Sequence, residues 1–144
     1  MKIAILGNGG REHSIAELIS KSQILEKLYC IPGNAGTNSI AENIDINVNN
    51  FSEILRVVKD RNIDMVIVGP EKPLVNGISD FLEKNNIKVF GPNKFCAQLE
   101  GSKTFTKLIC KKYNIPTANF GVFKKKYVAL VNQCHTVLVV LDCM

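Results

Sequence analysis

Four short apolar runs recur along the first part of the chain. They occupy residues 3–6, 28–31, 65–68 and 87–90. These runs are near-continuous in apolar residues instead of alternating with polar ones, which is typical of strands that are buried on both faces. Segments with helical spacing separate the runs. Because strands and helices alternate, the pattern predicts an α/β fold with a doubly wound parallel sheet.

Two of the intervening segments carry helix start signals. Asn50 is placed to cap a helix, and Glu53 follows three residues later. Apolar residues recur at helical spacing in that segment, namely Phe51, Ile54, Leu55 and Val58. Pro73 suits the first position of another helix. The inner face of this second helix would consist of Leu74, Ile78, Phe81 and Leu82.

The alternation of strand and helix ends after Asn93. A short helix is predicted to run through Phe95 and Leu99 to Gly101, and Ser102 is placed to cap the next helix. We therefore predict a domain boundary near Gly101, with an α/β domain over residues 1–101 and a second part over residues 102–144. One face of the helix after Ser102 carries three lysines, which are either simply solvated or face nucleotide phosphates: Lys103, Lys107 and Lys111.

Each of the four apolar runs ends in glycine or proline. The exits are residues 7–10, 32–36, 69–71 and 91–93. Any one of them could be an ordinary turn. In a parallel sheet, however, all four exits meet at the carboxyl edge, where open α/β sheets bind ligands. Four such exits at one edge therefore favour a binding site for a small polar ligand.

The first exit reads Gly7-Asn8-Gly9-Gly10-Arg11-Glu12-His13 and leads into a helix. Glycines let a backbone approach a ligand, and the N–H groups of a helix start attract anions, most often phosphate. Arg11 could add a bidentate contact. The dinucleotide fingerprint G-x-G-x-x-G would need a third glycine at Glu12 and an acid about twenty residues later, where Tyr29-Cys30-Ile31-Pro32 stands. A phosphate site and a plain packing turn both remain open, and NAD is disfavoured.

Two ionisable residues near these exits are ambiguous. Glu71 follows Gly69-Pro70 directly and is either an acid that favours a helix N-terminus or an acceptor for sugar hydroxyls or a ligand amine. His13 lies beside the glycine loop, where a packed or solvated histidine is the more usual case. No spacing of His, Cys, Asp and Glu resembles a metal site.

Composition narrows the class of protein. The 144 residues are 46% hydrophobic and 22% charged, as in a globular domain. The net charge of +5 suggests anionic ligands, but the lysines are scattered and aromatics make up only 7%, which argues against nucleic acid. The five cysteines contain no C-x-x-C pair, so we expect reduced thiols in the cytoplasm. No apolar run is long enough to span a membrane.

Taken together, five motifs closely resemble those of the glycinamide ribonucleotide synthetases, also called phosphoribosylamine–glycine ligases. In this order they are residues 7–13, residues 32–37 (Pro-Gly-Asn-Ala-Gly-Thr), residues 68–71 with 73–75, residues 90–92, and residues 98–103 (Gln-Leu-Glu-Gly-Ser-Lys). The resemblance extends from Met1 to about Phe123. It implies a Rossmann-like domain followed by the start of an ATP-grasp domain.

The resemblance also implies a function in purine biosynthesis. Such an enzyme joins glycine to 5-phosphoribosylamine and cleaves ATP, with Mg²⁺ or Mn²⁺, through a glycyl phosphate. The implied roles are that Gly9 and Gly10 offer N–H groups to the sugar phosphate, Glu71 holds the ribose or amine side, and Lys103 reaches toward ATP. The other implied substrate-binding residues are Asn8, Arg11, Gly33, Asn34, Gly69 and Pro70.

The chain departs from the family pattern in its last residues. Residues 137–144 read Val-Leu-Val-Val-Leu-Asp-Cys-Met, where the family has a strand V-x-K-A-D-G-L and then a glycine-rich loop. The metal-binding carboxylates of the family lie beyond this point. We therefore expect a truncated or frameshifted synthetase that binds ligand without catalysis. The alternatives are a non-catalytic phosphoribosyl- or nucleotide-binding module and, less favoured, a dehydrogenase domain.

Three further expectations concern the segment from 124 to 144. Lys124–Lys126 would be a solvated turn, and residues 137–141 would be a strand without its neighbours. The segment would be loosely ordered, pack on the first domain, or drive oligomerisation, because an unpaired apolar strand edge favours association.

Overall fold

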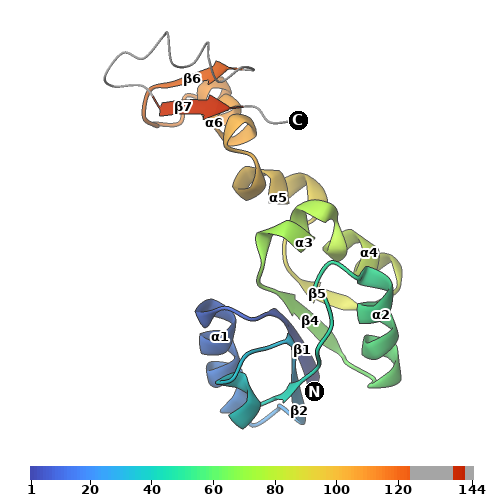
Figure 1. Ribbon diagram of the computed structural model, residues 1–144. Coiled ribbons are helices and arrows are strands. Elements are labelled where there is room, and N and C mark those ends of the chain that lie inside the picture. The colour runs from blue at the N-terminus through green and yellow to red at the C-terminus, as the bar shows by residue number, and fades with distance from the viewer. Residues whose placement is uncertain (124–137, 142–144) are drawn as a thin grey trace. The chain divides into compact units, whose positions relative to one another are not determined.

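The computed structural model describes residues 1–123 and 138–141, and the chain divides into two units, residues 1–97 and 98–144 (Figure 1). The strands of the first unit are β1 (Lys2–Gly7), β2 (Lys27–Pro32), β3 (Glu42–Asn43), β4 (Met65–Val68) and β5 (Lys88–Phe90). Its helices are α1 (Gly10–Ser20), the short 3-10 helix η1 (Thr37–Ser39), α2 (Phe51–Asp60), α3 (Glu71–Asn76) and α4 (Ile78–Lys84). Helix α5 (Lys94–Gly101) leads to the second unit.

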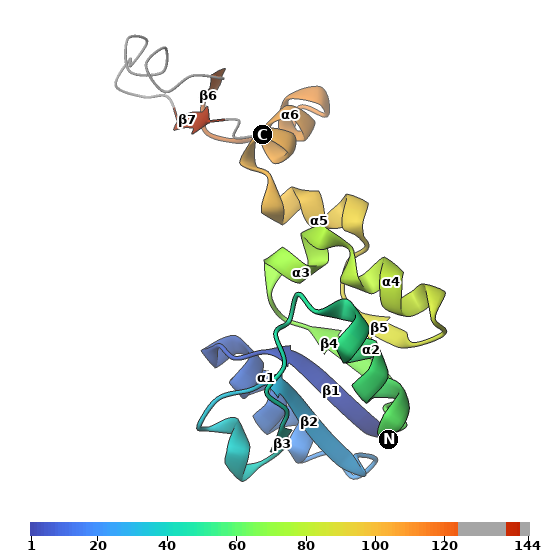
Figure 2. The same cartoon turned by 45° about the vertical axis from the view of Figure 1, so that its right-hand side comes forward.

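The five strands form one parallel sheet in the order β3-β2-β1-β4-β5 (Figure 2). Strand β1 is central, with Leu6 opposite Ile31 of β2 and Val68 of β4. The chain moves outward from β1 in both directions, so the predicted doubly wound parallel sheet is confirmed. Strand β3 was not predicted, because its two residues, Glu42 and Asn43, form no apolar run.

Helices cover both faces of the sheet, with α1 and α2 on opposite sides of β1 (Figure 1). Successive residues of a strand point to opposite faces. Ala4 and Leu6 accordingly pack with residues of α2 and α4, whereas Ile5 packs with Ala16 of α1. Burial on both faces is why β1, β2 and β4 read as continuous apolar runs. The prediction was wrong for β5, where Lys88 and Phe90 are exposed because it is the outer strand of the sheet.

Of the two predicted helix starts, one is confirmed and the other was wrong. Asn50 caps α2 as predicted, and its side chain accepts a hydrogen bond from the Glu53 N–H and donates one to the Glu53 carboxylate at 2.8 Å. The prediction that a single helix starts at Pro73 was wrong. Helix α3 begins at Glu71, and Gly77, with φ of +95°, separates it from α4. A left-handed residue cannot continue an α-helix, and glycine adopts this conformation without steric cost.

We expect Asn50→Ala to lower the free energy of unfolding by about 1 kcal/mol, because the first turn of α2 loses its side-chain cap. Urea unfolding measures this as a lower midpoint with an unchanged slope. The matched control is Ser52→Ala, an exposed position in the same turn. If the two variants unfold alike, the cap of Asn50 does not stabilise the helix.

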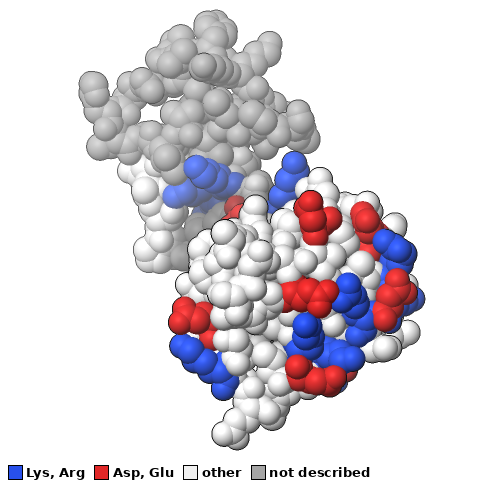
Figure 3. All heavy atoms as spheres, turned by 60° about the horizontal axis from the view of Figure 1, so that its bottom comes forward, with Lys and Arg blue, Asp and Glu red and all other residues white. Residues whose placement is uncertain are grey.

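Charges of both signs are interspersed on the face of the first unit that Figure 3 shows. At the β2–β3 edge, Glu42 accepts a hydrogen bond from Arg61 and pairs with Lys27 at 3.3 Å. The Arg61 hydrogen bond holds the pKa of the Glu42 carboxyl below its ordinary value. Charged side chains on the edge strand of a sheet disfavour its pairing with strands of other molecules.

The second unit contains α6 (Lys103–Lys112) and a parallel pair of strands, β6 (Phe120–Phe123) and β7 (Leu138–Leu141). Ser102 caps α6 as predicted, by accepting from the Phe105 N–H at 3.2 Å. The predicted strand at 137–141 corresponds to β7, but β6 lies beside it, so the expectation of a strand without neighbours was wrong. The expectations for residues 124–137 and 142–144 lie outside the described residues.

The cysteines were predicted to be reduced thiols. Cys30, Cys96 and Cys110 are free thiols, and Cys134 and Cys143 lie outside the described residues. Burial raises the pKa of the Cys30 thiol above its ordinary value.

Among the helices that the structure describes, none combines the length and apolar character needed to cross a bilayer.

Candidate functional site

A pocket of about 420 Å³ opens at the carboxyl edge of the sheet. Three strand exits contribute to it: Gly7 and Asn8 follow β1, Pro32 ends β2, and Pro70 follows β4. The predicted meeting of exits at one edge is therefore confirmed for three of the four. The exit of β5 does not line the pocket, because β5 is the outer strand on the far side of β4.

Residues after the unpredicted strand β3 complete the pocket. They are Asp45, Ile46, Asn47 and Val48. Ile46 is only 6% exposed and belongs to the core, whereas Asp45 and Asn47 are exposed. Polar and apolar residues alternate here, and this alternation was the available signal that Asp45 and Asn47 share one side of the chain. Sequence reasoning missed both.

Glu12 organises the glycine loop beside this pocket, and sequence reasoning missed this role. It lies in the first turn of α1 and is only 5% exposed. Its Oε2 accepts a hydrogen bond from the Gly9 N–H at 2.8 Å, and its Oε1 accepts one from Arg11 Nε at 3.1 Å. The Gly9 N–H, predicted to bind a sugar phosphate, is thus donated to Glu12. Gly10 differs, because a side chain there would meet open space.

Arg11 joins the exits of β1 and β4. Its Nη2 donates to the Gly69 carbonyl and lies 3.3 Å from Glu71 Oε1. Glu71 is the first residue of α3, so this ion pair spans two of the predicted binding loops. The hydrogen bond to Glu12 raises the pKa of Arg11 above its ordinary value. The guanidinium that was predicted to reach a phosphate is therefore held between two carboxylates.

Asn34 connects the exit of β2 to that of β1. Its Oδ1 accepts from the N–H groups of Gly36 and Thr37 at 2.8 and 3.0 Å, and its Nδ2 donates to the Asn8 carbonyl at 3.0 Å. Gly33, with φ of +75°, precedes it and donates its N–H to the Gly7 carbonyl at 3.2 Å. These contacts hold Asn8 against the pocket.

The ring of His13 packs against Gly36. A Cβ atom on Gly36 would lie 2.7 Å from His13 Nδ1, and the histidine is half-buried. Of the two usual cases that the sequence left open, packed or solvated, the structure shows the packed one.

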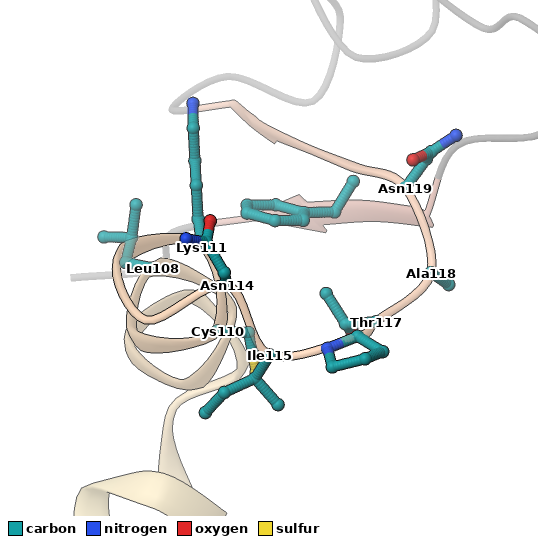
Figure 4. Close-up of a pocket in the computed structure, with 10 residues that line it drawn as sticks. Leu108, Cys110, Lys111, Asn114, Ile115, Thr117, Ala118 and Asn119 are labelled. Carbon is teal, nitrogen blue, oxygen red and sulfur yellow. The ribbon is translucent and has the colours of Figure 1, made fainter.

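A larger cavity of about 830 Å³ lies within the second unit, between the last turns of α6 and the loop over residues 114–119 (Figure 4). Lys111 of the lysine face lines it. Lys107 instead donates to the loop at Thr117 and at the Ala118 carbonyl, and Lys103 is exposed at the first position of α6. We place the candidate site in the smaller pocket, because that pocket is the one at which the predicted exits meet.

Within residues 1–123 and 138–141, no group of three or more His, Cys, Asp and Glu side chains is placed to hold a metal ion. Residues 1–100 match the protein-family model for the N domain of phosphoribosylglycinamide synthetase. The chain belongs to this family. The matched range contains the five-stranded sheet and every residue of the smaller pocket, so the candidate site is part of the synthetase N domain.

Individual relatives support the same family. A phosphoribosylamine–glycine ligase from Brucella melitensis biotype 1 is 48% identical over 123 residues, which are 85% of this chain and 29% of that protein. The crystal structure of phosphoribosylamine–glycine ligase from Thermotoga maritima has a TM-score of 0.61 and 33% identity, and the match covers 83% of this chain and 26% of that one.

A second solved structure shows the fold alone. N5-carboxyaminoimidazole ribonucleotide synthetase from Thermotoga maritima has a TM-score of 0.65 at 19% identity, with 90% of this chain and 35% of that one covered. The chain spans less than a third of the length of the curated synthetase relatives that it matches.

Proposed function

We propose that this chain supplies the phosphoribosylamine-binding part of an ATP-dependent phosphoribosylamine–glycine ligase. The observation that carries the proposal is the pocket at the carboxyl ends of β1, β2 and β4, inside the range that matches the synthetase N domain. Open α/β sheets bind their ligands at this edge. The ligase names of the Brucella and Thermotoga relatives suggest which ligand it is.

The chemistry of the pocket suits an aminosugar. Its side-chain polar groups are the carboxylate of Asp45 and the amides of Asn8 and Asn47. A carboxylate accepts hydrogen bonds from ribose hydroxyls and from an amine, and an amide both donates and accepts. The phosphate end of the ligand would lie toward Gly10, where the backbone faces open space, with Arg11 beside it. Glu71, on the other side of Arg11, would face the ribose or amine end.

The remaining reactants are proposed from the family resemblance. Glycine, ATP and Mg²⁺ or Mn²⁺ would complete the ligation, and Lys103 is the residue of this chain proposed to reach ATP. A divalent metal neutralises the transferring phosphate when an acyl phosphate forms. The role proposed for the described part of this chain is to bind and orient phosphoribosylamine. We place this role in the cytoplasm and propose that the ligands are small molecules, not nucleic acid.

Calorimetric titration with glycinamide ribonucleotide, the stable product, tests the proposal. We expect the unmodified chain to bind this compound and not NAD. Asp45→Asn should weaken the product's binding about tenfold, because one charge-assisted hydrogen bond becomes a neutral one. Asp60→Asn, at the exposed end of α2, is the matched control and should leave binding unchanged.

Each result has a distinct meaning. NAD binding without product binding would contradict the proposed ligand class. If Asp45→Asn and Asp60→Asn bound the product with equal affinity, the product would bind outside this pocket.

A further inference from the structure

Glu12 is the one buried charged residue among the side chains that the structure describes. It has two hydrogen-bond donors: the Gly9 N–H at Oε2 and Arg11 Nε at Oε1. A buried carboxylate is costly unless such partners compensate it. The position at which a dinucleotide fingerprint would place its third glycine therefore carries a satisfied anion.

Three glycines form a slot around this carboxylate. A Cβ atom on Gly69 would lie 2.6 Å from Glu12 Cδ, one on Gly7 would lie 2.8 Å from the same atom, and one on Gly9 would lie 2.8 Å from Oε2. Real Cβ atoms do not approach other atoms so closely, so the slot exists only because none of the three residues has a side chain. Its walls come from the exits of β1 and β4.

We propose that Glu12 is an internal anion that fills the anion slot of the glycine loop, and that it thereby excludes the diphosphate of a dinucleotide. In dinucleotide-binding folds the second glycine lets the diphosphate approach the backbone, and the third allows close packing of helix and strand. Here the N–H of the second glycine, Gly9, already binds a carboxylate. A diphosphate at Gly9 would compete for the same donor and be repelled by the same charge.

This inference is independent of the proposed substrate. The pocket of about 420 Å³ is lined by Gly7 and Asn8 but not by Gly9 or Glu12, so a phosphoribosyl ligand can bind there while the slot stays filled. The inference instead concerns the Gly7-x-Gly9 loop after the first strand, where the filled slot would exclude a dinucleotide.

The test uses inorganic pyrophosphate as the probe and the backbone amide signal of Gly9 in ¹H–¹⁵N spectra as the readout. In the unmodified chain the Gly9 signal should not move as pyrophosphate is added. In Glu12→Gln the negative charge is removed at nearly constant shape, and pyrophosphate should shift the Gly9 signal saturably, with an affinity at least about tenfold higher. Glu12→Gly, which restores G-x-G-x-x-G, should behave in the same way.

Glu17→Gln is the matched control, because Glu17 is exposed on the same helix and pairs with Lys21 at 3.3 Å. It removes the same charge from the chain and should leave the Gly9 signal unmoved. Saturable movement of that signal in the unmodified chain or in Glu17→Gln would overturn the inference. So would an unmoved Gly9 signal in Glu12→Gln or Glu12→Gly when the β1 amide signals show that the variant is folded.

Discussion

Replacing Gly69 with alanine is expected to destabilise the first unit by about 3 kcal/mol and to abolish binding of glycinamide ribonucleotide. The added Cβ atom would lie 2.6 Å from Cγ and Cδ of Glu12, which is only 5% exposed. Glu12 must then leave the slot, and the loss combines overpacking with an unpaired Gly9 N–H. Arg11 loses one of its two carboxylate partners at the same time.

Urea unfolding and calorimetric titration measure the two effects of Gly69→Ala. The matched control for urea unfolding is Gly10→Ala, because a Cβ atom there meets nothing within 4 Å and Gly10 is the first residue of α1. Alanine at that position should leave stability unchanged or raise it by about 0.4–1 kcal/mol. If Gly69→Ala were as stable as Gly10→Ala, the contact between Glu12 and the backbone of Gly69, the residue after β4, would not exist as described.

Most of the sheet was predictable from the sequence, and its one unpredicted strand shows why. Strands β1, β2 and β4 each contain a continuous apolar run, because both of their faces are covered. The run at β5 contains Lys88, and Phe90 is exposed, so this outer strand was predicted although only one of its faces packs on the core. Strand β3 has two polar residues at the sheet edge and is defined only by its pairing with Tyr29 and Cys30. Pairing of that kind is a tertiary property, so a local pattern does not reveal it.

The candidate site was predictable as a place but not as a set of contacts. The gathering of glycine and proline exits follows from parallel topology alone, and three exits do line the pocket. The roles of Glu12 and Arg11 were not predicted. Glu12 accepts from the N-cap N–H of its own helix, and its position three residues after Gly9 was the available local signal. Arg11 reaches the exit of β4, which is a tertiary contact that no local pattern reveals. Relative to the dinucleotide fingerprint, Glu12 is only a missing glycine, whereas the structure shows a carboxylate that accepts two hydrogen bonds.

Hydrogen bonds tie the exits together before any ligand binds. The Arg11–Glu71 pair connects β1 to β4, and the contacts of Asn34 connect β2 to β1. Several residues that were predicted to touch substrate therefore also build the loops in this structure. A site whose loops are fixed in advance loses less entropy on binding. Variants of these residues should consequently change stability and affinity together, unless the substitution is chosen to separate the two.

Asn34 allows that separation. Asn34→Ala is expected to lower the free energy of unfolding by about 3 kcal/mol, because the N–H groups of Gly36 and Thr37 lose their acceptor. Thr37 is only 1% exposed, so water does not readily replace the lost bond. Asn34→Asp keeps an acceptor oxygen for both N–H groups and removes only the donor to the Asn8 carbonyl. It should cost about 1 kcal/mol.

Asn34→Asp should lose more binding free energy than stability, whereas Asn34→Ala should lose more stability than binding free energy. Asn34→Asp places a carboxylate oxygen against the Asn8 carbonyl and so displaces a residue that lines the pocket. We expect it to weaken binding of glycinamide ribonucleotide about tenfold, a loss equivalent to about 1.4 kcal/mol. Asn38→Ala, an exposed neighbour in η1, is the matched control for titration and urea unfolding. Unchanged affinity in Asn34→Asp would mean that Asn8 holds its position without Asn34, and the pocket would then depend on the glycine loop alone.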